Sequence, residues 1–156
     1  MKIGDKVPDF FLPDCNAQRV HISNFFRHWV VLYFYPKDNV TASIQQANAF
    51  SKNIQDFESL NAVVVGVCND TIAGLYSFTK RHAVRIILLS DKDGKVARQF
   101  GVWTARRIGT EEKPTIARTT FIINPGGTIV HKWDNVRIEG HLEEVKNKLE
   151  ELRKKK

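Results

Sequence analysis

Apolar runs alternate with periodic stretches along the chain, and together they predict strands and helices in turn. Residues 29–35 (WVVLYFY) and 62–67 (AVVVGV) are almost entirely β-branched or aromatic. This composition is typical of parallel strands that are buried on both faces. From Ser43 to Leu60, between these runs, apolar residues recur every three or four positions, which predicts one helix with a single apolar stripe.

The rest of the chain continues the same alternation. A helix over about residues 71–82 leads to a third apolar strand within 85–91 and to a short helix within 93–102. Residues 109–117 (GTEEKPTIA) are polar and predict a loop. Two hairpins and a closing helix complete the pattern: 10–12 with 19–22, 118–133 around Pro-Gly-Gly, and 142–152.

Strands joined by helices pair in parallel, whereas hairpins contribute antiparallel strands. The order of elements therefore predicts the α/β class, as a three-layer α/β/α sandwich with a central mixed β-sheet and an N-terminal β-hairpin. No repeat, linker or low-complexity segment interrupts the pattern, so we expect a single domain over residues 1–156. No apolar run approaches the roughly 20 residues that a membrane helix needs.

The net charge of +7 is concentrated in one part of the chain. Residues 81–120 alone carry a net charge of +5. This segment is either an ordinary solvated surface or a basic interaction module for nucleic acid or an acidic protein. No nucleic-acid-binding motif accompanies the charge, so we do not expect nucleic acid as a partner. The arginines that set this segment apart are Arg81, Arg85, Arg98, Arg106 and Arg107.

Cysteine and histidine are sparse and widely spaced. Cys15 and Cys68 are too far apart for a CxxC motif and too few for a disulfide scaffold. The charged N-terminal segment lacks an apolar signal core, so we expect a cytoplasmic location. The five histidines, at positions 21, 28, 82, 131 and 141, lack metal-ligand spacing, and we expect neither a metal nor a cofactor.

Strand direction predicts where a site would lie. Ligands of open α/β sheets bind beyond the carboxyl ends of the parallel strands. The loop before Ser43 and the turn at Cys68 lie at that edge, and an antiparallel strand starting near Arg118 begins there too. We therefore expect Ser43, Cys68 and Arg118 to lie in one neighbourhood.

Several segments in their order resemble one known family. They are GDKVPDFFLPD, VVLYFYPKD, VVVGV, LLSDKDGKVARQFGVW, RTTFIINPGGTI and GHLEEV. Together they are similar to the bacterioferritin comigratory protein (peroxiredoxin Q) branch of the AhpC/TSA-like peroxiredoxins, across nearly the whole chain. The resemblance implies a thioredoxin-like fold. It also implies reduction of hydrogen peroxide and organic hydroperoxides by a cysteine thiolate, which a thiol donor such as thioredoxin regenerates.

The resemblance places the peroxidatic position on a serine. Read without gaps, the Thr-Pro-Gly-Cys segment of the family falls on Val40, Thr41, Ala42 and Ser43. A shift of one residue would make Thr41 the threonine of the family, but no shift supplies a cysteine.

Three further positions of the family are carried over in the same way. The resolving cysteine falls on Asn48, which we expect to be an exposed helix residue. A frequent glutamate falls on Gln46. The active-site arginine matches Arg118, which either binds an anion or takes part in an ordinary buried salt bridge.

These substitutions predict that peroxidase turnover is absent. A serine hydroxyl is too weak an acid to ionise in this position. Its oxygen also has no accessible oxidised state that could play the role of the sulfenic acid. Ser43-Ile-Gln-Gln46 instead fits a capping box, S/T-x-x-E/Q, at the start of a helix. The sequence thus favours a peroxiredoxin-like protein with a binding or regulatory role.

Cys68 supplies the alternative in the enzyme class. One interpretation is a relocated redox thiol, in a thiol peroxidase or redox sensor, whose pKa is lowered by Arg118. The other interpretation is a small apolar residue that closes a buried strand.

Overall fold

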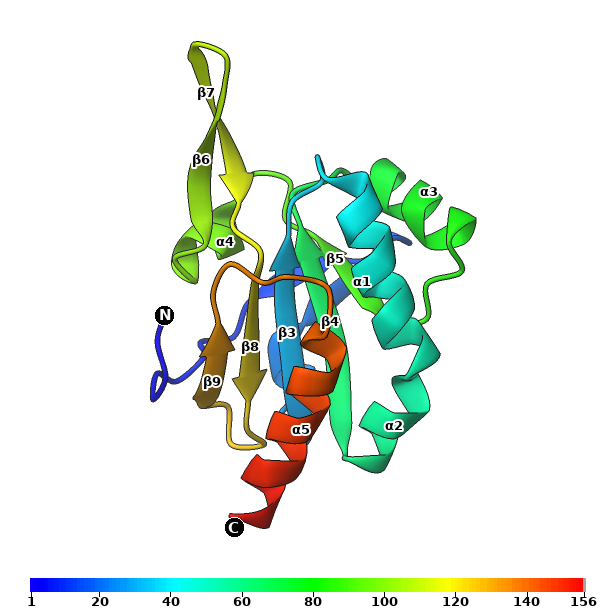
Figure 1. Cartoon of the computed structure of the whole chain (residues 1–156), viewed down its shortest axis with the longest axis vertical. Helices are drawn as coiled ribbons and strands as arrows, with labels where there is room; N and C mark the ends of the chain where they lie inside the picture. Colours follow the sequence, from blue (N-terminus) through cyan, green and yellow to red (C-terminus); the bar gives the residue numbers. More distant parts are fainter. Residues whose placement is uncertain (156) are drawn as a thin grey trace.

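A five-stranded mixed sheet forms the centre of the molecule (Figure 1). The computed structural model describes residues 1–155. Three strands run parallel, and two further strands are added antiparallel on one side. In spatial order the strands are β5 (Ile87–Ser90), β4 (Ala62–Cys68), β3 (Trp29–Tyr35), β8 (Thr119–Ile123) and β9 (Ile129–Trp133).

The alternation of side chains along β3 divides the core into two halves. Val31, Tyr33 and Tyr35 face one layer of helices, whereas Leu32 and Phe34 face the opposite layer. All seven residues of β3 are buried, as the apolar run predicts. The first layer consists of α1 (Val40–Lys52), α2 (Ile54–Ser59), α3 (Ile72–Arg81) and α5 (His141–Lys154).

The opposite face is covered by shorter elements. The N-terminal hairpin, a 3-10 turn and one short helix pack there against the even-numbered side chains of β3. The three-layer arrangement with an N-terminal hairpin is therefore confirmed, although helix and hairpin share the second outer layer. These elements are β1 (Phe11–Pro13), β2 (Arg19–His21), η1 (Ile22–Phe25) and α4 (Lys95–Gln99).

A close approach within the sheet explains one glycine. Gly66 lies opposite Tyr33 in the β3–β4 pair, and a Cβ at position 66 would lie 2.7 Å from the Tyr33 ring. Tyr33 in turn stacks on Phe50 of α1, with ring centroids 5.0 Å apart. The absence of a side chain at Gly66 thus lets the aromatic layer between β3 and α1 form.

The prediction of a loop over residues 109–117 is wrong. Glu111–Ile116 forms β7, which pairs antiparallel with β6 (Trp103–Ile108). Much of this hairpin is exposed, and Figure 1 shows it extending beyond the rest of the molecule. The first four residues of β7 are exposed. An exposed stretch needs no alternation of apolar residues, so its polar composition resembles that of a loop.

The prediction of one helix from Ser43 to Leu60 is also wrong in its bounds. α1 begins three residues earlier, at Val40, and ends at Lys52. Asn53 then leaves the helical conformation and donates a side-chain hydrogen bond to the Ala49 carbonyl over 2.8 Å, after which α2 continues. The apolar stripe passes through this break, which is why the pattern alone does not reveal it.

Candidate functional site

The turn between β3 and α1 is closed by Asn39. The Asn39 side chain accepts a hydrogen bond from the Ala42 backbone N–H over 3.4 Å, as an N-cap does. Ser43 lies one residue further along, and its own N–H donates to the Asn39 carbonyl over 3.1 Å. The predicted capping box at Ser43 is therefore wrong, because the helix has already begun there.

With its backbone already in the helix, the Ser43 side chain makes tertiary contacts. Its hydroxyl donates to the Pro36 carbonyl over 3.3 Å and accepts from Nη2 of Arg118 over 3.4 Å. Nη1 of Arg118 donates to Oε1 of Gln46 over 2.8 Å. Ser43 and Gln46 are both buried. Gln46 thus contacts Arg118 instead of capping the helix, and its Nε2 has no hydrogen-bond partner among the described residues.

Arg118 lies in the short connection from β7 to β8, which begins at the carboxyl edge of the parallel strands. Its carbonyl accepts from the Val136 N–H over 2.9 Å, which fixes the backbone. Burial lowers the pKa of the guanidinium below its ordinary value, while nearby Asp38 acts in the opposite direction. Within residues 1–155 Arg118 forms no ion pair. The salt bridge, one of the two expectations for Arg118, is not formed within the described residues, and anion binding stays a prediction.

Asp38 connects the β3–α1 loop to the protruding hairpin. Its carboxylate accepts from Oγ1 of Thr115 over 3.4 Å and from Nη1 of Arg106 over 3.5 Å. Thr115 is in β7 and Arg106 is in β6. These contacts hold the base of the hairpin against the loop that precedes Ser43.

A pocket of about 180 Å³ lies on the side of Ser43 that faces α3. Tyr35, Ser43 and Cys68 line it together with Leu75 and Phe78. Arg118 contacts Ser43 through Nη2. Ser43 therefore lies close to both Cys68 and Arg118, as the strand directions predict.

Cys68 ends β4 and is fully buried, and burial raises the pKa of its thiol to about 11. The interpretation of Cys68 as a redox thiol with a lowered pKa finds no support here, because loss of solvation dominates. Cys15 is half-buried at the N-terminal hairpin, and both cysteines are free thiols. The interpretation of Cys68 as a small apolar residue of the core fits these observations.

The remaining carried-over positions lie along the first turns of α1. Val40 is 52% exposed, and Thr41 is also exposed. Asn48 is half-buried, not exposed as expected. The structure therefore brings together Ser43, Gln46 and Arg118, whereas Val40 and Thr41 face solvent.

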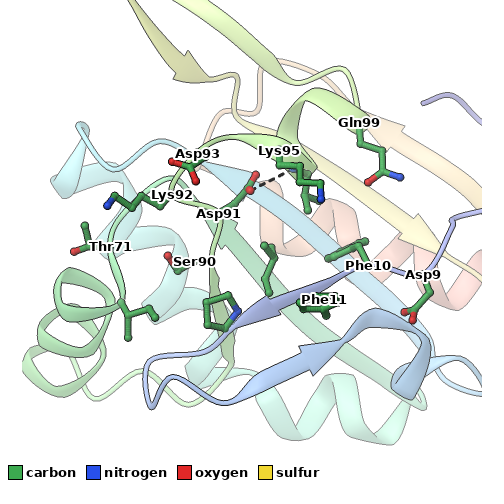
Figure 2. Close-up of a pocket in the computed structure, with 14 residues that line it drawn as sticks. Asp9, Phe10, Phe11, Thr71, Ser90, Asp91, Lys92, Asp93, Lys95 and Gln99 are labelled. Carbon is green, nitrogen blue, oxygen red and sulfur yellow. Dashed lines mark hydrogen bonds between the residues drawn. The ribbon is translucent and has the colours of Figure 1, made fainter.

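A larger pocket, of about 780 Å³, which no sequence pattern had indicated, lies between β1 and the loop from β5 to α4 (Figure 2). Phe10, Phe11 and Val96 contribute apolar surface to it. Buried Asp91 accepts backbone hydrogen bonds from Val96 over 3.2 Å and Ala97 over 2.8 Å, so its carboxylate stabilises the start of α4. That carboxylate is already engaged by the protein.

Similar sequences extend over nearly the whole chain. The profile described as the AhpC/TSA family matches residues 3–132. A putative peroxiredoxin Bcp of Helicobacter pylori strain J99 is 36% identical over 145 residues, which cover 93% of this chain and 95% of that protein. Peroxiredoxin Bcp of Bacillus subtilis strain 168 is 31% identical over 155 residues, covering 99% of each chain.

Solved structures agree in fold over a similar extent. A cysteine-to-serine mutant of Xylella fastidiosa PrxQ superposes with a TM-score of 0.91 at 33% identity, covering 98% of both chains. The bacterioferritin comigratory protein of Xanthomonas campestris superposes with a TM-score of 0.84 at 27% identity, covering 90% of both chains. That structure was described together with the alkyl peroxide reduction activity of the Xanthomonas protein.

Proposed function

Because the chain belongs to the AhpC/TSA family, in its Bcp (peroxiredoxin Q) group, we propose that it is a peroxiredoxin that does not turn over peroxide and acts by binding or regulation. It has the thioredoxin-like fold of these proteins. The family activity is reduction of peroxides with electrons from a thiol donor such as thioredoxin. In this proposal Ser43 stands at the peroxidatic position and Asn48 at the resolving position, so neither thiol of that cycle is present.

The hydrogen bonds of Ser43 carry the proposal. Its hydroxyl donates to the Pro36 carbonyl, and its other partner is the cationic Arg118. A serine nucleophile needs a base that accepts its proton, and a backbone carbonyl is not such a base. Within residues 1–155 no histidine or carboxylate contacts the Ser43 hydroxyl. Both thiol chemistry and base-activated serine chemistry are thus unsupported at this position.

A binding role is consistent with the state of Arg118. Arg118 is half-buried, its guanidinium has neutral hydrogen-bond partners, and it forms no ion pair within the described part of the chain. An anionic group that reached it would gain a charge-assisted hydrogen bond. We also propose a cytoplasmic location, since Cys15 and Cys68 are both unpaired.

Hydroperoxide consumption tests the proposal. The native protein is incubated with thioredoxin, thioredoxin reductase, NADPH and either hydrogen peroxide or cumene hydroperoxide. The Xanthomonas protein serves as an active control, and heat-denatured protein of the present chain gives the background. We expect a rate equal to that background. A rate well above it with either substrate contradicts the proposal.

A second candidate function, as a thiol peroxidase or redox sensor, uses Cys68. One observation favours it: this thiol lines the same pocket as Ser43. A buried thiol with a pKa of about 11 has little thiolate at neutral pH, which opposes it. Trapping of sulfenic acid after peroxide treatment, followed by mass spectrometry, distinguishes the two. We expect an unlabelled Cys68, and efficient labelling would establish the redox function instead.

A further inference from the structure

The protruding hairpin has two faces of different charge. In the β6–β7 ladder Arg106 lies directly opposite Lys113, and Arg107 lies directly opposite Glu112. Side chains of directly paired residues lie on the same face of a ribbon, and successive residues alternate between faces. Arg107 and Glu112 therefore place opposite charges side by side on one face, whereas Arg106 and Lys113 place two like charges side by side on the other.

A like-charged pair across two strands destabilises a ribbon unless something else compensates it. By the same alternation, Thr104, Arg106, Lys113 and Thr115 share one side of the ribbon, with Glu111 on that side near the tip. We define the basic face of the hairpin as the first four of these residues. Asp38 contacts this face through Arg106 and Thr115. Among residues 1–155 Lys113 forms no ion pair at all, so the compensation is incomplete.

The surroundings of the basic face add further positive charge. The contacts of Asp38 place this face toward the loop between β3 and α1, where Lys37 is exposed. Arg118, two residues beyond the end of β7, is a further cation at this end of the hairpin. Asp38 is thus the one carboxylate named here against several cations, and it forms an ion pair with Arg106. Val40, 52% exposed at the start of α1, supplies an apolar contact beside them.

We propose that the basic face, together with the adjoining β3–α1 loop, docks an extended acidic segment of a partner protein. Carboxylates match guanidinium groups in charge and in planar geometry, and a peptide brings them at separated positions. Nucleic acid fits less well, because its phosphates form a continuous line of negative charge. Such a line would pass the exposed Glu111, which lies on the same side of the ribbon near the tip of the hairpin.

Asp38 occupies part of this surface in the free protein. Its ion pair with Arg106 spans 3.5 Å, and the two side chains are 39% and 58% exposed. Exposed pairs of this kind contribute little stability, so a carboxylate of the partner can replace Asp38 at small cost. The acidic segment would compete with Asp38 for Arg106 and would in addition reach Lys113.

Fluorescence anisotropy with a labelled ten-residue peptide of alternating glutamate and glycine tests the proposal at low ionic strength. We expect binding that weakens as salt is added. Arg106→Gln and Lys113→Gln should each weaken it about three- to fivefold, as loss of one exposed charge pair does. Arg107→Gln is the matched control, since it removes the same charge from the neighbouring position on the opposite face. Asp38→Asn should tighten binding.

Three results would contradict this proposal. The first is that the peptide does not bind to the wild-type protein, and the second is that Arg107→Gln and Arg106→Gln weaken binding equally. The third is that a single-stranded oligonucleotide of equal charge binds more tightly than the peptide. Circular dichroism of each variant verifies that the fold is kept. This docking surface rests on the binding role proposed above, but different results would contradict each. Peroxide turnover would contradict the proposed function alone, and equal effects on the two faces would contradict only the docking surface.

Discussion

The Ser43 hydroxyl lies 3.4 Å from the Arg118 guanidinium, in the first turn of α1. A cation and a helix N-terminus are the two neighbours that lower the pKa of a thiol. Two features of position 43, the cation and the helix start, would therefore stabilise a thiolate, but the side chain there is a hydroxyl. That Val40, Thr41 and Ala42 stand where the family has Thr-Pro-Gly stays a prediction from the resemblance.

Ser43→Cys tests how far this environment alone supports catalysis. We expect the variant to regain little peroxide consumption. By the resemblance, the three residues before position 43 differ from the Thr-Pro-Gly of the family, and this change remains in the variant. The measurement is the thioredoxin-coupled rate, compared with the wild-type protein and with a peroxidase-active relative. Recovery of the rate of that relative would show that the serine alone accounts for the inactivity.

Sequence reasoning predicted the proximity of Ser43 and Arg118 because strand directions decide which loops share an edge. It failed for Gln46 and Asn39, since a Ser-x-x-Gln segment has the same spacing at a helix start and within a helix. Only the position of the first turn distinguishes the two cases, and that position depends on how Pro36–Asn39 leaves the sheet.

Asn39→Ala tests the observed cap. The change removes the side-chain acceptor for the Ala42 N–H, and we expect the free energy of unfolding to fall by about 1 kcal/mol. Urea denaturation followed by far-UV circular dichroism measures it. If Asn39→Ala leaves stability unchanged, the helix does not depend on this cap.

At the scale of elements, buried strands and amphipathic helices were predictable and the exposed hairpin was not. β3 and β4 are apolar because both of their faces are covered. β7 contains Pro114 and three consecutive charged residues, which in a sequence indicate a loop. The same charges, once placed in register with β6, define the two faces of the hairpin.

The attachment of α5 to the sheet involves a buried polar contact that responds to pH. His141 at the start of α5 makes a 2.8 Å hydrogen bond through Nε2 to the Thr120 hydroxyl in β8, and its ring packs against Trp133. Burial lowers the pKa of His141 below the ordinary 6.5, although Glu144 acts in the opposite direction. The folded state thus favours the neutral ring.

His141→Gln tests this contact. Because the pKa is lower in the folded state, the unfolded chain binds a proton first as pH falls below about 6.5. The His141 contribution is therefore present above that pH and is lost below it. We expect the fall in the free energy of unfolding from pH 7 to pH 5 to be smaller in His141→Gln than in wild type. Parallel curves for the two proteins would contradict this role; urea titrations at each pH provide them.

At the scale of the whole molecule, β3 links both halves of the core. Its even-numbered side chains pack with α4 and the N-terminal hairpin, and its odd-numbered side chains pack with the long helices. None of the helices in residues 1–155 is long and apolar enough to cross a membrane. That the chain forms one domain stays a prediction, which the shared strand supports.

Phe100→Ala tests that prediction. Phe100 is fully buried and lies 5.2 Å from Phe34 and 5.4 Å from Phe121 between ring centroids. We expect a loss of about 3–5 kcal/mol in the free energy of unfolding, within a single transition. Tryptophan fluorescence and far-UV circular dichroism should report the same midpoint. Two separate midpoints would indicate two domains.

The central claim is that this fold, with a hydroxyl at position 43, has no nucleophile there that peroxide can oxidise and a donor can restore. The most direct measurement is hydroperoxide consumption by the variant in which Cys15 and Cys68 are both replaced by alanine, with a thiol donor in excess. We expect no turnover beyond the background without protein. Repeated and rapid consumption by this sulfhydryl-free variant would contradict the account.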